Sequence, residues 1–408
     1  MIETAMTVGI VDLNNGATKV NKVEVSKQGR LLAGAGMWSA SEFHRSLLSK
    51  LHGAECQNVV FINTGPLTGS GVPGSGTWSV TYLSPLTGCF VTEPVVGGLG
   101  AKLRYAGLEQ LIILGRAKNP VYIMISDDEI KLHDASSIWE LTTCESTDAI
   151  IHEVDEPDPE VAVIGPGSVS WPGQGLIVNY YFDAGELGLG NLFAKVLLKG
   201  IVANGRGKVA LAHPEHFLDL CLKICQRCQD DLSHLSGTGR FLSPWHTARC
   251  VPVPGEEHKF VLEPFSEECA PERPRQLTGK QLLRLRHFGN SYGIPWRWVM
   301  EAIAQNTCLI KPEYELSAGD FWRVMAMRRQ PLYTGRVEGF MDPFWIALEA
   351  AGLDWSGHFS RKEAAELAAK LLSYATGAPW DSFELEELGI QITTAKMTAG
   401  EKGEEKWL

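Results

Sequence analysis

Gly65-Pro66-Leu67-Thr68-Gly69 is repeated nineteen residues later as Ser84-Pro85-Leu86-Thr87-Gly88. Each copy places proline early in a tight turn and glycine beyond it, where a positive φ costs nothing. Between the copies, Trp78-Ser79-Val80-Thr81-Tyr82-Leu83 alternates in the way that is typical of a strand. This stretch therefore predicts β structure interrupted by glycine-rich turns.

Short apolar runs of the same kind recur from the start of the chain to about residue 210. They are Thr7–Val11, Val59–Ile62, Ser79–Leu83, Leu111–Leu114, Val121–Ile125, Val161–Ile164 and Lys208–Leu211. Helices are expected between them at Ser39–Leu51 and around Thr147–Glu153. The pattern predicts a β-rich α+β domain.

The pattern changes near Ala212-His213-Pro214, and we place there the boundary between two domains, 1–212 and 213–408. Beyond it apolar residues follow helical spacing, and Ser360 with Glu363 forms a capping-box signature. The helices expected are Pro214–Leu232, Thr278–Ser291, Trp296–Gln305, Ser317–Arg329, Pro343–Ala351 and Ser360–Thr376. The polar, proline-rich stretch Leu242–Arg275 predicts loop or linker.

Composition narrows the class of protein. The 408 residues carry a net charge of −11, which argues against nucleic acid or an anionic membrane as a partner. No apolar run approaches the length that spans a membrane, and the first residues do not resemble a signal peptide. Nine scattered cysteines, an odd number, do not suggest a disulfide framework, so we expect a reducing, cytoplasmic compartment.

Two further blocks are Gly97-Gly98-Leu99-Gly100-Ala101-Lys102-Leu103-Arg104-Tyr105-Ala106-Gly107 and Gly165-Pro166-Gly167. With the repeated turns, and in this order, they resemble the N-terminal domain of the aldehyde:ferredoxin oxidoreductase family. Those enzymes oxidise aldehydes to carboxylates with a tungsten or molybdenum bis-pterin and an iron–sulfur cluster. The resemblance is strong over about 1–215 and weaker beyond. Asn290-Ser291-Tyr292-Gly293-Ile294 stands where the family has a helix ending in Asp-x-x-Gly-Leu/Ile-Asp.

The resemblance implies a base of two packed sheets on which a pterin lies. The expected fold class is therefore α+β, with a β-rich two-sheet N-terminal domain followed by a reduced all-helical region. The resemblance also implies two pterin-facing loops as candidate cofactor-binding sites. Their residues are Gly97, Gly98, Gly100, Ala184, Gly185 and Gly188. The other interpretation of these glycines is helix–sheet packing alone.

The residues expected to bind pterin phosphate have changed. Thr77 stands at one family arginine, and Asp183 and Glu186 stand at two others. A guanidinium binds phosphate bidentately, whereas a carboxylate repels it. The carboxylates expected near the metal are Asn290 and Pro295 here, so no catalytic residue can be named.

The family's Cys-x2-Cys-x3-Cys motif has no counterpart at its expected place. One other trio, Cys221, Cys225 and Cys228, falls on a single face of a predicted helix. These thiols could hold an iron–sulfur cluster, with Cys250 or Cys308 as a fourth ligand. Since free cysteine is a common core residue, we expect packing in the interior, with the cluster as the alternative.

Two functional hypotheses remain. The first is a non-catalytic or assembly subunit that keeps the fold and binds no cofactor. The alternative is an active oxidoreductase holding tungstopterin or molybdopterin and a 4Fe-4S cluster in a non-standard way. In both cases we expect a homo- or hetero-oligomer with redox subunits, because tryptophans that can anchor interfaces are frequent in the second half.

Overall fold

The structure is a computed structural model. It describes residues 5–34, 58–154, 158–234 and 342–401, short strands between 241 and 262, and residues 289 and 291–294. Short gaps inside these ranges fall at 87, 89, 128, 171–174, 176, 180–181, 186 and 356–358. The helices expected at Ser39–Leu51, Trp296–Gln305 and Ser317–Arg329, and nearly all of Thr278–Ser291, lie outside the described residues.

The first part of the chain folds into two mixed six-stranded sheets. The first sheet has the order β2-β1-β6-β3-β4-β5, in which β1 and β6 are parallel and the other neighbours antiparallel. Its strands are β1 (Ala5–Asp12), β2 (Ala17–Glu24), β3 (Val60–Thr64), β4 (Thr77–Leu83), β5 (Phe90–Val96) and β6 (Gln110–Leu114). Helix α1 (Lys27–Gly34) follows β2, and α3 (Leu99–Tyr105) precedes β6.

The second sheet repeats this topology. Its order is β8-β7-β12-β9-β10-β11, and again one pair, β7 with β12, is parallel. Its strands are β7 (Val121–Ile125), β8 (Ile130–Asp134), β9 (Glu160–Ile164), β10 (Ile177–Asn179), β11 (Phe182–Ala184) and β12 (Leu198–Ala203). The helices here are η3 (Ser136–Ile138), α4 (Thr143–Val154), α5 (Gly167–Ser170) and α6 (Leu189–Lys195).

Sequence and topology repeat together. Gly65-Pro66 directly follows β3, and Gly165-Pro166 directly follows the equivalent strand β9. Likewise α3 begins with Leu99-Gly100, and α6 begins with Leu189-Gly190. The two-sheet base is therefore one unit of hairpin, helix, three strands, helix and strand, used twice.

The main core lies between the sheets. In β4, Trp78, Val80 and Tyr82 face this core, because successive strand residues point to opposite faces. The second sheet contributes Ile164 and Ile201 among others, and α3 and α6 fill the remaining space with leucine and phenylalanine. The predicted α+β class with two packed sheets is confirmed.

The strand predicted at Lys208–Leu211 is wrong, since these residues are irregular. The position Cβ would take at Gly205 is 2.0 Å from the Ala106 nitrogen, so the chain is pressed against the end of α3. Gly207 N also donates to the Tyr105 carbonyl at 3.0 Å. This contact holds the segment against α3. The strand of this region is instead β12, just before it.

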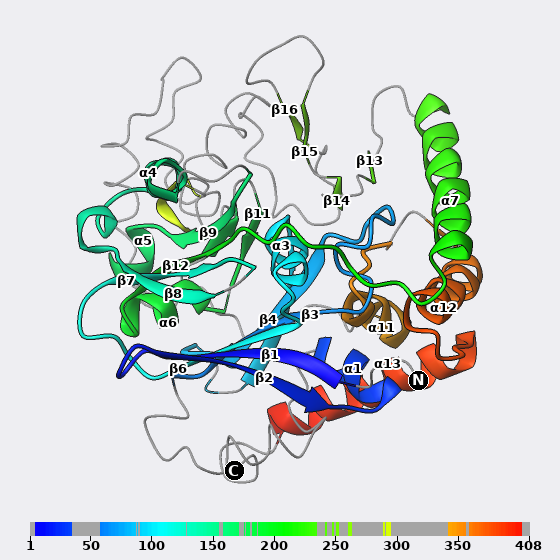
Figure 1. Cartoon of the computed structure of the whole chain (residues 1–408), viewed down its shortest axis with the longest axis horizontal. Coiled ribbons are helices and arrows are strands. Elements are labelled where there is room, and N and C mark those ends of the chain that lie inside the picture. The colour runs from blue at the N-terminus through cyan, green and yellow to red at the C-terminus, as the bar shows by residue number, and fades with distance from the viewer. Residues whose placement is uncertain are drawn as a thin grey trace, which may run out of the picture.

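The second part of the chain contains α7 (Pro214–His234), α11 (Pro343–Ala351), α12 (Arg361–Thr376) and α13 (Ser382–Glu401). They gather to one side of the sheets, at the right and along the lower edge in Figure 1, around a core that Leu31, Leu67 and Val72 complete. The stretch expected to be loop adds short strand pairs, β13 (Phe241–Leu242) with β14 (Thr247–Ala248) and β15 (Cys250–Pro252) with β16 (Phe260–Leu262). Among the described helices, none is both long and apolar enough to cross a membrane.

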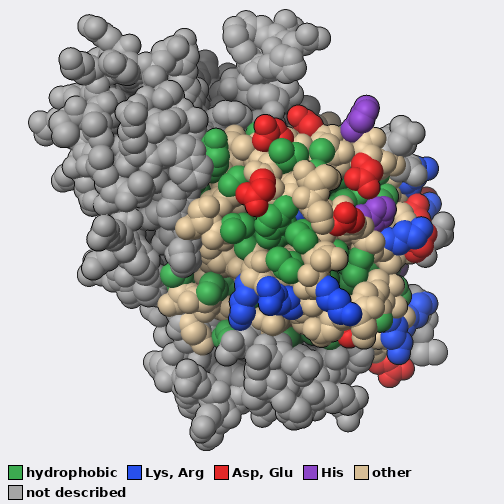
Figure 2. All heavy atoms as spheres, turned by 90° about the vertical axis from the view of Figure 1, so that its left-hand side faces the viewer, with side chains coloured by type: hydrophobic (Ala, Val, Ile, Leu, Met, Phe, Trp, Pro, Cys, Tyr) green, Lys and Arg blue, Asp and Glu red, His purple; other side chains and the backbone are tan. Residues whose placement is uncertain are grey.

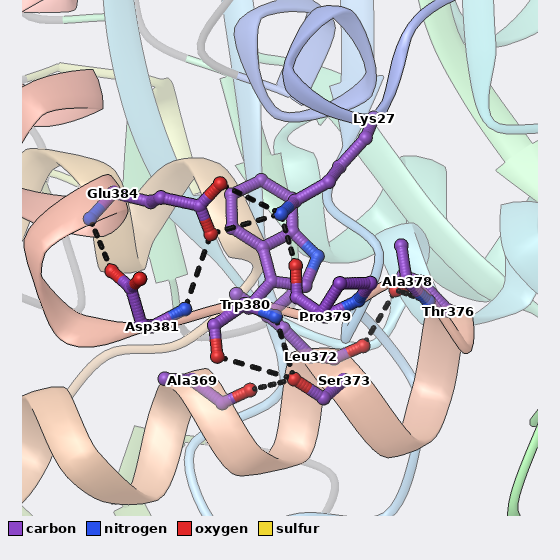
Figure 3. A network of polar contacts seen from close by, with 10 residues as sticks. All are labelled: Lys27, Ala369, Leu372, Ser373, Thr376, Ala378, Pro379, Trp380, Asp381 and Glu384. Carbon is purple, nitrogen blue, oxygen red and sulfur yellow. Dashed lines mark hydrogen bonds and ion pairs between the residues drawn. The ribbon is translucent and has the colours of Figure 1, made fainter.

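The capping box predicted at α12 does not form. Ser360 is the N-cap residue, but its side chain makes no capping hydrogen bond, and Glu363 instead pairs with Arg227 of α7. A reciprocal box forms at α13, where Glu384 N donates to Asp381 Oδ1 at 2.8 Å and Asp381 N donates to Glu384 Oε2 at 3.2 Å (Figure 3).

Lysine 27 joins the first helix to the last helical hairpin. Its ammonium donates to both Glu384 carboxylate oxygens at 2.9 Å and to the Pro379 carbonyl. It also lies 4.2 Å from the centre of the Trp380 ring (Figure 3). Since α1 lies against the first sheet, this contact ties the C-terminal helices to it.

Candidate functional site

The first glycine loop lies at the start of α3. Gly97 has φ +137°, which glycine adopts readily, and Gly98 is the N-cap residue of α3. The position Cβ would take at Gly98 is 2.2 Å from Glu160 Oε1. Glu160 is buried at the start of β9. A carboxylate of the chain itself therefore occupies the space beside this loop.

Gly100 has a packing role. The position its Cβ would take is 2.7 Å from the Trp78 Cβ, so α3 lies directly on β4. Thr77, which precedes Trp78, is buried, and its hydroxyl has no hydrogen-bond partner among the described residues. A threonine at this position offers a short neutral hydroxyl where the family resemblance implies a guanidinium.

The second glycine loop is fastened to the first sheet. Gly185 N donates to Glu93 Oε2 at 2.9 Å, and Glu93 also accepts from the Tyr82 hydroxyl. Nearby, Ser84 Oγ donates to the Leu187 carbonyl at 2.8 Å. Both predicted pterin-facing loops thus have a carboxylate of the chain beside them, Glu160 at the first and Glu93 at the second.

The glycines of the second loop are also closely packed against neighbouring residues. Gly188 has φ +91°, and a Cβ there would lie 2.7 Å from Pro85 Cγ. Gly185 has φ +97°, and its Cβ would lie 2.4 Å from that of Leu189. The side chains of Asp183 and Ala184, and all of Glu186, lie outside the described residues.

Two helix ends meet the two Gly-Pro turns. Gly352 ends α11 with φ +97°, and its backbone lies against Gly65. Gly293 has φ +68°, and the backbone of Tyr292 lies against Gly165 in the equivalent place. Each half of the duplicated base therefore receives one glycine-terminated helix end.

The sequence analysis predicted the helix Pro343–Ala351 but did not match its end at Gly352 to the family pattern. Glu349-Ala350-Ala351-Gly352-Leu353-Asp354 has the spacing of the family pattern sought at 290–295, with acids at both ends. Both helix ends also lead to tryptophan, as Gly293-Ile294-Pro295-Trp296 and Gly352-Leu353-Asp354-Trp355. That shared spacing was the signal that could have found it.

The structure describes the side chains of two of the three predicted cysteines. Cys221 is buried and donates to the Gly71 carbonyl at 3.3 Å, and Cys225 is half-buried beside it. Both are free thiols. Burial, with Cys225 as a lesser cause, raises the pKa of Cys221 to about 12. The side chain of Cys228 lies outside the described residues. No group of three His, Cys, Asp or Glu placed to hold a metal occurs among the residues that are described.

A pocket of about 780 Å³ lies beside the first loop. Its walls come from α3, the loop 69–71 and the segment 205–211. Gly98, Glu160 and three cations, Lys102, Arg206 and Lys208, are among the lining residues. On the side of the molecule at the left of Figure 1, most of the visible acidic groups lie in the upper part, and several Lys and Arg side chains lie in the lower part (Figure 2).

Comparison with known proteins gives the family of the first part. Residues 8–205 match the family described as "Aldehyde ferredoxin oxidoreductase, N-terminal domain". The tungsten-containing aldehyde ferredoxin oxidoreductase of Pyrococcus abyssi (strain GE5 / Orsay) is 32% identical over 233 residues, 56% of this chain and 38% of that protein. In Pyrococcus furiosus, "Aliphatic sulfonate oxidoreductase, WOR-like subunit" is 29% identical over 180 residues, 41% of this chain and 28% of that protein. The match thus spans well under half the length of these curated relatives.

One solved structure is similar along nearly the whole chain. It is "Active site complex BamBC of Benzoyl Coenzyme A reductase in complex with 1,5 Dienoyl-CoA", with a TM-score of 0.69 and 14% identity. The similarity covers 99% of this chain and 90% of that one. At this identity it shows a shared fold and nothing of shared chemistry.

Proposed function

Because residues 8–205 form an N-terminal domain of the aldehyde ferredoxin oxidoreductase type, we propose that this chain is a divergent relative serving as a non-catalytic or assembly subunit. It keeps the two-sheet base, with its glycine turns. The groups described beside the predicted cofactor loops do not fit a phosphate-bearing pterin.

The observation that carries this proposal is the pair of carboxylates at the glycine loops. Glu160 lies against Gly98, and Glu93 accepts the hydrogen bond of Gly185 N. Each of the two predicted pterin-facing loops therefore has a carboxylate of the chain beside it. Two like charges at 4 Å repel by roughly 4 kcal/mol at an effective dielectric constant of 20, so each carboxylate disfavours a bound phosphate.

The replacement of the expected arginines also disfavours a bound phosphate. Thr77 supplies no charge, and the sequence places Asp183 and Glu186 at the other two arginine positions. A phosphate would therefore exchange charge-assisted bidentate contacts for repulsion. A role as a subunit is supported by the name of one Pyrococcus furiosus relative, "Aliphatic sulfonate oxidoreductase, WOR-like subunit".

The alternative, an active oxidoreductase with a metal pterin bound in a non-standard way, draws on one observation. The helix end 349–354 keeps acids at both ends of the family spacing and packs against the first Gly-Pro turn. Asp354 is bound there through its own nitrogen, which donates to the Gly74 carbonyl at 3.0 Å.

Elemental analysis separates the two roles. The protein is purified from cells supplied with tungstate and molybdate. Tungsten, molybdenum and iron are then measured by elemental analysis, and pterin is measured by the fluorescence of its oxidised form. We expect far less than one metal or pterin per chain. One tungsten or molybdenum per chain, together with pterin, would overturn the non-catalytic role and support the alternative.

A further inference from the structure

Helix α7 buries one face and exposes apolar residues on the other. Phe217, Cys221 and Ile224 lie in the core that α7 shares with α12, at a spacing that puts them on one face of the helix. On the outer side, Leu218 and Leu222 are exposed to 54% and 63% of their full area. They are four residues apart, so they are neighbours on the helix surface. Since α7 stands at the right-hand edge of the molecule in Figure 1, this apolar pair lies at its margin.

A pair of opposite charges lies beside these two leucines. Asp219 Oδ2 is 2.7 Å from the Lys223 ammonium, and both side chains are 67% exposed. Each of the two follows one of the leucines in sequence, so the acid and the base lie on the same flank of the apolar pair. An exposed ion pair of this spacing contributes only about 0.3–0.5 kcal/mol. Because both groups are largely solvated, each can still approach a second group of opposite charge.

These features match a second copy of the same helix in antiparallel orientation. A twofold axis perpendicular to the plane of two antiparallel helices keeps the charged flanks of both copies on the same side. One register of this pair places Asp219 level with Lys223 of the second copy, and Lys223 level with Asp219. In that register the leucines of the two copies alternate along the helix axis, two residues or about 3 Å apart. The outer face of α7 is therefore complementary to itself in both charge and apolar side chains.

The exposed apolar residues of α13 lack this complementarity. Phe383 and Ile390 are exposed to a similar degree, 65% and 56%. Glu387 lies between them on the outer side of the helix and is also exposed. An antiparallel pair of α13 helices centred between the two apolar residues would bring the Glu387 carboxylates of both copies together, and like charges repel. The charges therefore favour α7 over α13 as a surface for self-association.

We propose that the chain forms a homodimer through α7, in which Leu218 and Leu222 of the two copies interdigitate and Asp219 pairs with Lys223 across the interface. This goes beyond the function proposed above, and it does not depend on whether the chain binds a pterin, because α7 contains none of the glycine-loop residues. A contact between two helix faces is smaller than the roughly 1,200–2,000 Å² that stable interfaces bury. We therefore expect dimers to form at micromolar concentrations.

Sedimentation equilibrium of the full-length protein tests the proposal. The wild type should show a monomer–dimer equilibrium at micromolar concentrations. The double variant L218K/L222K should weaken dimerisation at least about tenfold, because it removes the apolar contact and places like charges across the interface. The control F383K/I390K makes the same change of charge at similarly exposed apolar residues of α13 and should leave the affinity within about twofold. A wild-type protein that stays monomeric, or equal effects of the two double variants, would overturn the proposal.

Charge reversal tests the pairing in a way that a loss of folding could not reproduce. D219K makes the flank wholly positive and K223D makes it wholly negative, so each variant alone should dimerise about fivefold more weakly than the wild type. An equimolar mixture of the two variants should recover the dimer, because the flanks then attract each other. D219K/K223D, which keeps both charges in exchanged positions, should dimerise like the wild type. A mixture as monomeric as its two components would refute the proposed interface.

Discussion

Glu160 lies so close to Gly98 that a Cβ on residue 98 would meet its carboxylate oxygen at 2.2 Å. The two residues come from different sheets of the duplicated base, since Gly98 precedes α3 and Glu160 begins β9. The contact therefore joins the two halves at the loop where the family resemblance implies a cofactor.

Gly98→Ala should destabilise the protein by about 1–3 kcal/mol, because the added methyl group overpacks a buried contact. The backbone of Gly98 is in the ordinary helical region, φ −74°, so backbone strain adds nothing. In a Glu160→Ala background the same substitution should cost much less. Urea unfolding of the four proteins measures this coupling, and strictly additive effects would contradict the contact.

Glu109→Gln should cost about 3 kcal/mol at neutral pH, because it leaves two partly buried guanidinium groups without their charged partner. Glu109 lies 2.8 Å from Arg30 Nε and 2.7 Å from Arg104, and it accepts from Thr7 N at 3.0 Å. Urea unfolding at pH 7 measures the cost. Glu129→Gln, at an exposed ion pair with Lys131, is the control and should cost less than about 1 kcal/mol.

Lowering the pH should remove the contribution of Glu109 to the stability of the fold. Burial alone would raise the pKa of this carboxyl, but the charges of Arg104 and Arg30, with hydrogen bonds from Arg30 and Thr7 N, outweigh burial, so the pKa is lowered. A carboxyl with a lowered pKa stabilises the fold above its ordinary value near 4.5 and loses this effect as the pH falls through the folded value. The difference in unfolding free energy between wild type and Glu109→Gln should therefore shrink below pH 4.5. A difference that stays constant would contradict the lowered pKa.

Because of Lys199, the stability of the protein should rise as the solution becomes alkaline. Its side chain is fully buried, and its ammonium donates to the carbonyls of Trp139 at 3.1 Å and Leu141 at 2.9 Å. Burial lowers its pKa to about 8, from 10.5. Between these values the unfolded chain binds more protons than the folded one, so stability rises with pH, by on the order of 3 kcal/mol.

Unfolding of wild type and Lys199→Met at pH 7 to 10 tests this rise. The unfolding free energy of wild type, relative to that of Lys199→Met, should increase as the pH increases. Lys195→Met, at an exposed residue of α6, should follow the wild-type curve. If Lys199→Met also follows that curve, the lowered pKa is not present.

Lys27→Met should loosen the attachment of the last two helices. Loss of the ion pair with Glu384 and of the contact with the Trp380 ring should cost about 1 kcal/mol, because the side chains of Lys27 and Glu384 are both partly exposed. Amide hydrogen exchange in the turn between α12 and α13 should become faster, while the sheets keep their protection. Lys370→Met, at an exposed residue of α12, serves as the control, and equal exchange in the two variants would count against this role.

Elements with strong local signals were predicted closely. The helix Pro343–Ala351 has the predicted bounds, because Asp342 caps its start through Phe344 N, proline follows, and Gly352 ends it in the left-handed region. The strand Val121–Ile125 was likewise confirmed. By contrast, β12 was missed, because Lys199 and Gly200 interrupt its apolar pattern and only a contact with the turn at Trp139 and Leu141 makes a buried lysine tolerable.

Residue type and spacing along the chain were enough to predict the family of the first part and its glycine turns, and to suggest that the arginines expected at the pterin phosphates are replaced. The repeated topology of the base, and the contacts of Glu160 and Glu93 with the two glycine loops, are visible only in the folded chain. These are contacts between residues far apart in sequence, and local spacing carries no information about which distant side chain fills a given space.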